Sequence, residues 1–125
     1  MLSFVSALAL VAAQAASATP VEQAPSPPLP ALSAPQAAAL RCGVVFAMGA
    51  KMQAAGKPAA ASWPPLDTKG REFFVRSAAR IMEETGADRA AIQALAAVQL
   101  STLKNDAAVA DAVPGCLVLL EAAGL

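Results

Sequence analysis

Residues 33–56, SAPQAAALRCGVVFAMGAKMQAAG, decide the fold of this chain. Ser33 and Gln36 have the spacing of a capping box, in which the serine side chain and the glutamine side chain satisfy free backbone N–H groups. A proline between them is tolerated in the first helical turn. Gly56, with a proline two residues later, is typical of a helix end. The stretch therefore predicts a helix from about Ala34 to Ala55.

This predicted helix has two contrasting faces when successive residues are placed about 100° apart. One face is broad and apolar, and the opposite face carries only small residues. Small residues let another backbone approach closely, so we expect the helix to be contacted on two sides. The apolar face comprises Leu40, Cys42, Val44, Val45, Phe46, Met48 and Met52, and the small face comprises Gly43, Ala47, Ala50 and Ala54.

Further helices follow, each with its own start or stop signal. After a loop at residues 57–67, a second helix is expected from about Thr68 to Thr85, with a glycine as its stop. Asp88 is suited to cap a third helix, and Asp106 to cap a short helical piece. A last helix is expected from Gly115 to Ala123, because the proline before it fits a first turn. No stretch alternates apolar and polar residues with β-branched side chains, so a sheet is not indicated.

The two cysteines lie in the first and last predicted helices. Cys42 and Cys116 have 73 residues between them. In an exported chain, two such distant cysteines are most simply one disulfide, although free thiols or a redox-active cysteine remain alternatives. A closed loop of this length stabilises a fold by about 4 kcal/mol on the chain-entropy model. We therefore expect an all-α fold, a compact bundle of four to five helices closed by one disulfide.

The composition also indicates a thin core. The chain has 125 residues, enough for one domain, and 57% of them are nominally hydrophobic. However, 34 of those residues are alanine. A core with so few larger side chains depends on close helix contacts and on a covalent cross-link.

The N-terminal part reads as an export signal followed by a spacer. Residues 1–18 are uncharged and largely apolar, and Ala16-Ser17-Ala18 fits a signal-peptidase site, so we expect a signal peptide there. The alternative is a membrane anchor or apolar tail, since no Lys or Arg precedes the apolar run. Residues 19–33 are rich in proline and alanine and predict an extended linker. The helical domain then covers residues 34–125, and the expected location is the periplasm or the extracellular medium, with no membrane span after processing.

Several classes of function are excluded or disfavoured. The chain contains no histidine and no tyrosine, which rules out Ser-His-Asp and Cys-His catalysis. Two lone cysteines do not supply the four ligands of a zinc site, and no glycine-rich phosphate loop is present. A net charge of zero disfavours nucleic acid as a partner. We therefore expect no enzyme, no metal and no cofactor.

Charge is nevertheless unevenly distributed. Residues 33–80 carry seven basic and two acidic side chains, a net charge of +5, and residues 81–125 carry two basic and six acidic ones, a net charge of −4. This asymmetry favours electrostatic complementarity between the two halves of one bundle. Self-association through the resulting dipole is the alternative.

The second predicted helix contains the candidate binding surface. Its core face is expected to be Phe74, Val75, Ala78, Ile81 and Met82. Phe73 falls on the opposite face, and an aromatic ring among basic groups can bind an anionic or aromatic ligand or a partner helix. Alternatively, Phe73 lies under the loop that holds Trp63, while Arg76 pairs with Glu72 and Arg80 pairs with Glu83 or Glu84. The candidate surface comprises Trp63, Lys69, Phe73, Arg76 and Arg80.

A family resemblance rests on four segments. These are the Cys42 helix, Trp63-Pro64-Pro65, Gly70-Arg71-Glu72-Phe73-Phe74-Val75-Arg76, and Pro114-Gly115-Cys116-Leu117. With these segments the chain, from about Pro35 to Leu125, resembles a group of uncharacterised small exported two-cysteine helical proteins of Gram-negative bacteria. The resemblance implies the same architecture and transfers no activity or site.

Two functions are compatible with these features. The first is a non-enzymatic exported binding or interaction module of the cell envelope, with a protein partner. The second is a periplasmic acid-stress chaperone, because such chaperones are also small, helical and closed by one disulfide. The shared architecture is the only basis for that second hypothesis.

Overall fold

The structure, a computed structural model, describes residues 28–125. It consists of α1 (Ala34–Ala54), the short 3-10 helix η1 (Pro58–Ala60), α2 (Leu66–Thr85), α3 (Arg89–Thr102) and α4 (Asp106–Ala122). No strand occurs in this part of the chain, so the predicted all-α fold is confirmed, with four α-helices. The predicted signal peptide and residues 19–27 of the predicted linker lie outside the described residues and stay predictions.

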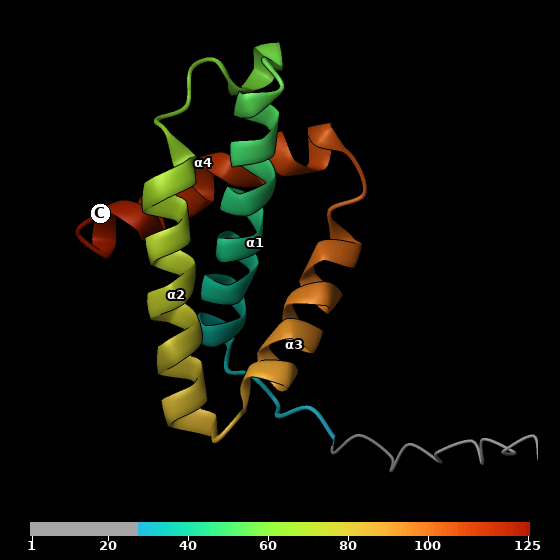
Figure 1. Ribbon diagram of the computed structural model, residues 1–125, viewed down its shortest axis with the longest axis vertical. Coiled ribbons are helices and arrows are strands. Elements are labelled where there is room, and N and C mark those ends of the chain that lie inside the picture. The colour runs from blue at the N-terminus through green and yellow to red at the C-terminus, as the bar shows by residue number, and fades with distance from the viewer. Residues whose placement is uncertain (1–27) are drawn as a thin grey trace, which may run out of the picture.

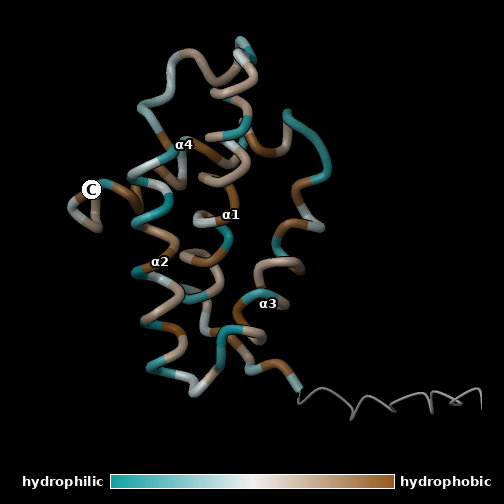
Figure 2. Tube along the Cα trace, viewed as in Figure 1, coloured by the Kyte–Doolittle hydropathy of each residue, from teal (hydrophilic) through white to brown (hydrophobic). Residues whose placement is uncertain are grey.

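The helix α1 is the centre of the bundle. It lies between α2, which runs antiparallel to it, and α3, which runs in the same general direction as α1, while α4 crosses these helices at a steep angle (Figure 1). All three other helices contact α1. Figure 2 shows hydrophobic and hydrophilic segments along every helix, with hydrophilic residues concentrated in the turn between α3 and α4. The expectation that α1 is contacted on more than one side is confirmed.

The start of α1 has the predicted cap. The Gln36 N–H donates to Ser33 Oγ at 3.3 Å, and the Ser33 N–H donates to Gln36 Oε1 at 2.9 Å. Both bonds satisfy backbone groups at the point where the helix has no earlier turn. The capping box therefore fixes where the helical domain begins.

Three glycines let α1 and α2 pack closely; we call Gly43, Gly49 and Gly70 the glycine seam. A methyl group at any of the three positions would overlap a side chain of the facing helix. The seam therefore brings the two backbones nearer than larger residues would allow. From a Cβ built at each position, the nearest atoms are Phe74 Cδ2 at 2.5 Å for Gly43, Leu66 Cδ1 at 2.7 Å for Gly49 and Phe46 Cβ at 2.6 Å for Gly70.

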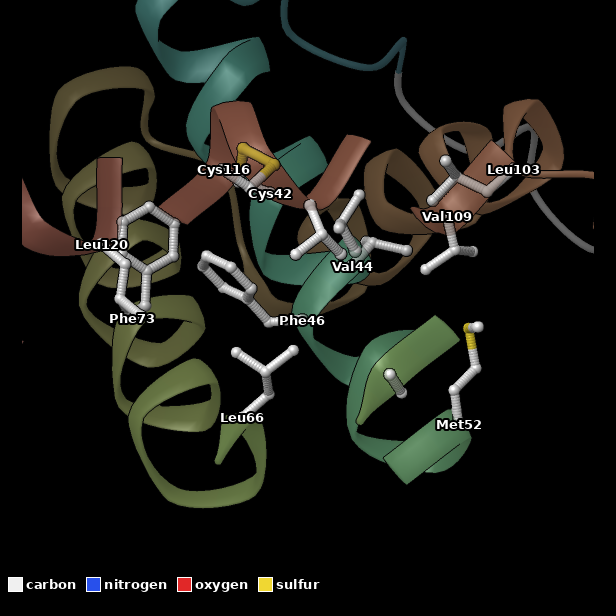
Figure 3. Close-up of a cluster of buried hydrophobic side chains, with 13 residues drawn as sticks. Cys42, Val44, Phe46, Met52, Leu66, Phe73, Leu103, Val109, Cys116 and Leu120 are labelled. Carbon is white, nitrogen blue, oxygen red and sulfur yellow. A yellow bond between two sulfur atoms is a disulfide. The ribbon is translucent and has the colours of Figure 1, made fainter. Parts of the chain in front are cut away.

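The main core joins α1, α2 and α4. Phe46 and Phe73 meet edge to face, with ring centroids 5.3 Å apart and planes at 86°. Leu120 of α4 lies beside this pair (Figure 3). Cys42 and Cys116 form a buried disulfide with their Cα atoms 5.2 Å apart, which confirms the predicted cross-link between α1 and α4.

The start of α2 depends on a residue of α1. The side-chain amide of Gln53 donates to the carbonyl oxygens of Pro64, at 2.8 Å, and Trp63, at 3.3 Å. Its own oxygen accepts the Leu66 N–H at 3.0 Å. Because this side chain supplies an acceptor that no residue at the local helix start provides, α2 begins at Leu66 rather than at Thr68 as predicted.

The prediction of two separate helical pieces near the C-terminus was wrong. One helix, α4, runs from Asp106 to Ala122 with Pro114 inside it, and Asn105 rather than Asp106 is its N-cap. A proline in a helix interior removes one backbone hydrogen bond. The buried apolar residues on both sides of Pro114, together with the disulfide at Cys116, hold the two halves in one continuous helix.

No helix within residues 28–125 is long and apolar enough to cross a membrane.

Candidate functional site

A groove lies where α1 begins, the middle of α2 passes and α4 ends. It encloses about 750 Å³ and combines apolar and charged lining. Small alanine side chains of α1 and α4 form much of its wall, so its shape is set by the helix backbones. We call it the α1–α2–α4 groove. The lining residues that matter here are Phe73, Arg76, Arg80, Glu84 and Leu119.

Phe73 is part of the core and not of an exposed aromatic patch. Only 5% of its surface is exposed, and its ring packs against Phe46. The predicted placement on the face opposite the core was therefore wrong. Val75, which was expected in the core, is 58% exposed instead.

The physical reason is that α2 is covered on two sides. The helix α1 packs against the side that carries Gly70, and α4 packs against the adjacent side, where Leu120 reaches the Phe73 ring (Figure 3). The neighbouring helices bury a wider arc of α2 than apolar periodicity selects. Phe73 packs in the core together with four residues of the predicted core face, Phe74, Ala78, Ile81 and Met82. Val75, about 200° from Phe73 around the helix, faces away from both partners.

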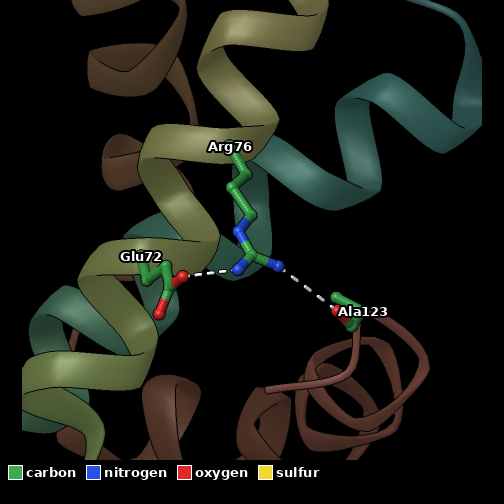
Figure 4. Close-up of polar contacts among 3 residues, drawn as sticks. All are labelled: Glu72, Arg76 and Ala123. Atoms are coloured by element: carbon green, nitrogen blue, oxygen red, sulfur yellow. Dashed lines mark hydrogen bonds and ion pairs between the residues drawn. The ribbon is translucent and has the colours of Figure 1, made fainter.

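Arg76 connects α2 to the end of α4. Its guanidinium pairs with Glu72 one turn earlier, as the sequence predicted, and its Nη1 donates to the Ala123 carbonyl oxygen at 3.5 Å (Figure 4). A cation near the last carbonyls of a helix also offsets the helix dipole. The side chain is exposed, so the Glu72 pair contributes little stability. Its main effect is to hold the guanidinium at the groove.

Arg80 lines the same groove and has no ion pair with a described residue. The predicted alternative, pairing with Glu83 or Glu84, does not occur within residues 28–125. Glu84 instead accepts a hydrogen bond from the side-chain amide of Gln36 at 2.7 Å, which ties the start of α1 to the end of α2. Within residues 28–125, no carboxylate therefore pairs with the Arg80 guanidinium, which has five N–H donors.

Two residues of the predicted surface lie elsewhere. Trp63 is half-buried against the core and lines a separate hollow of about 480 Å³ at the other end of α1. Lys69 is exposed and does not line the groove. Of the five predicted residues, the structure brings together only Phe73, Arg76 and Arg80.

The groove can bind a group that is anionic at one end and apolar beside it. Leu119 and the alanine side chains of the groove offer apolar contact, and the two guanidinium groups offer charge-assisted hydrogen bonds to a carboxylate. Within residues 28–125 there is no cluster of three or more acidic or cysteine side chains that could hold a metal ion. The described residues thus support binding chemistry at this site.

Sequence reasoning missed the groove residues that come from other helices. Leu119 and Gln36 lie far from α2 in the sequence, and no local pattern connects them to Arg80. The predicted resemblance to small exported proteins supplies no activity, so the role of the groove has to come from its own residues. Comparisons with protein-family models, curated proteins and solved structures each find no match to this chain.

Proposed function

We propose that this protein is a non-enzymatic binding module of the cell envelope, exported to the periplasm, that holds a partner protein in the α1–α2–α4 groove. The observation that carries the proposal is Arg80. Its guanidinium lines an open groove and has no ion pair with a described residue, next to the apolar surface of Leu119. A partner that supplies the missing anion would gain both contacts at once.

The groove defines the chemistry of the partner. A glutamate or aspartate side chain would face Arg80, and an apolar side chain one helical turn away would lie on Leu119. Arg76 adds a further set of donors, because five N–H groups exceed the two contacts that it makes here. An acidic amphipathic helix presents this pattern on one face.

The disulfide supports the proposed location. Structural disulfides persist in oxidising compartments and are rare in the cytoplasm. The Cys42–Cys116 bond is buried and links two separate helices, which is the pattern of a structural bond. The signal peptide proposed at residues 1–18 would deliver the chain to such a compartment.

Site-specific photocrosslinking in cells tests the proposal. A photoreactive amino acid at Leu119 reports on the groove, and the same amino acid at Val75 reports on the exposed outer side of α2. We expect one discrete crosslinked protein from position 119 and none from position 75. The crosslink should disappear when Arg80→Glu reverses the charge at the groove.

The test variant must leave the hydrophobic core intact. Phe73→Asp would place a carboxylate against Phe46 and unfold the protein, so loss of capture by that variant would carry no information. Arg80 is exposed, and its replacement leaves the core intact. Equal crosslinking from both positions, or crosslinking from position 119 that Arg80→Glu leaves unchanged, would overturn the proposal.

A further inference from the structure

The outward side of α4 is exposed, separate from the core and uncharged except at one position. Asp111, Gly115, Val118 and Ala122 recur at spacings of three and four residues, so they form one face of the helix. All four are exposed, and Val118 is 65% exposed. We call these residues the outer α4 face.

Gly115 is the feature of this face that the folded chain does not explain. Each of the three seam glycines is needed for contact between α1 and α2, whereas a Cβ at Gly115 would meet nothing within 4 Å. A glycine in a helix interior costs about 0.5–1 kcal/mol relative to alanine. The chain carries this cost at a position where its own packing gains nothing from it.

We propose that a second copy of this chain covers the outer α4 face, with the two α4 helices packed antiparallel about a two-fold axis. In such a pair, Gly115 of each copy lies opposite Val118 of the other. The space above Gly115 would hold Val118 of the other copy, which is the most exposed large hydrophobic side chain of the described residues. In a two-fold arrangement each copy contributes the same surface to the contact, so the outer α4 face can form the whole interface.

The unused N–H donors of Arg76 favour a second copy as the occupant. With Gly115 opposite Val118, Asp111 of one copy lies opposite Ala122 of the other. That position is beside the Ala123 carbonyl, where Arg76 is already held. Asp111 would then approach a guanidinium that already pairs with Glu72 but has further N–H donors, so each Arg76 would hold one carboxylate of its own copy and one of the other.

Besides Glu72, which pairs with Arg76, the neighbouring acidic group is Glu121, which lies on the other flank of α4. Glu121 is about 200° from Ala123 around the helix, so it is turned away from the Arg76 side. Arg80 is not used in the pairing and stays free for the partner proposed above. Arg76 and Ala122 belong both to the groove and to this pairing, so the two proposals are distinguished by Arg80→Glu, which should abolish the groove crosslink and leave the dimer unchanged.

Sedimentation equilibrium of the purified full-length protein tests the pairing. We expect a reversible dimer whose dissociation constant rises at least tenfold with Val118→Glu, because a charge would enter the contact, equivalent to about 1.4 kcal/mol. The matched control is Val75→Glu, at a position that is also more than half exposed but lies on α2. That control should leave the dissociation constant unchanged.

A charge exchange tests the register. In a Glu72→Gln background, which removes the intrachain partner of Arg76, Asp111→Arg should weaken the dimer by placing like charges opposite each other, and adding Arg76→Asp should restore it. A wild-type protein that is a monomer at every concentration overturns the proposal. So does equal weakening by Val118→Glu and Val75→Glu, or a monomer whose position 118 crosslinks to a different protein.

Discussion

The glycine seam and the outer α4 face use the same residue type in opposite surroundings. At Gly43, Gly49 and Gly70, a side chain from the facing helix occupies the space that a Cβ would need. At Gly115, that space is open. Packing at the glycine seam is complete within one chain. On the outer α4 face, no side chain of the same chain fills the space beside Gly115.

This difference shows how a thin core is made stable. The chain contains few large apolar side chains, and it compensates by bringing helix backbones close together at glycines. If glycine within a helix serves this one purpose throughout the protein, Gly115 marks a contact between copies. The following changes test that reading, beginning with the largest expected effect.

Removing the disulfide should have the largest effect on stability. Cys42→Ser with Cys116→Ser should lower the free energy of unfolding by about 4 kcal/mol, because the bond closes a loop of more than 70 residues. Urea unfolding monitored by circular dichroism at 222 nm measures the loss. Unfolding of the wild-type protein under reducing conditions should match the variant, and no difference between oxidised and reduced protein would contradict the structural role of the bond.

Filling the seam should cost less than breaking the disulfide. Gly70→Ala places a methyl group 2.6 Å from Phe46 Cβ, an atom fixed close to the backbone, so we expect a loss of about 2 kcal/mol. Gly49→Ala is the matched comparison, since it meets only the end of the Leu66 side chain and should cost less. Equal effects would show that the seam tolerates a shift of the helices.

The same substitution on the outer face should have the opposite sign. Gly115→Ala adds a methyl group in open space and raises helix propensity, so the free energy of unfolding of the isolated monomer should increase by about 0.5–1 kcal/mol. Thermal unfolding at high dilution measures it, because a dimer would add a concentration-dependent term. A destabilised monomer would mean that Gly115 has a role within the chain.

Local signals in the sequence predicted much of the fold. The capping box at Ser33, the Asp88 cap and the stop at Gly86 each depend on residues within a few positions of one another, and all three occur. The pairing of Cys42 with Cys116 followed from there being two cysteines. These features need no knowledge of which helices are neighbours.

The errors came where a second helix decides the outcome. Periodicity selected a core face on α2 that included Val75, but the positions of α1 and α4 bury Phe73 instead. The split at Pro114 was also wrong, because buried residues on both sides hold α4 together. The effect of a proline is predicted from its neighbours in the sequence, whereas the packing that overrides it here involves residues far away in the sequence.

The candidate groove could be predicted only in part for the same reason. Arg76 and Arg80 share a helix face, so their proximity was evident from spacing. Leu119 and the Gln36–Glu84 contact come from α4 and α1, and their arrival at the groove depends on how three helices cross. The hydrogen bonds of Gln53 at the start of α2 were also missed, because nothing near Gln53 in the sequence requires an amide side chain at that position.

Sedimentation equilibrium of Gly115→Ala beside the wild-type protein tests the central claim most directly. If Gly115 keeps the outer α4 face open for a second copy, the alanine variant should be the more stable monomer and yet dissociate at higher concentration than the wild-type dimer. A variant that associates as strongly as the wild-type protein, or a wild-type protein that never associates, would contradict the account.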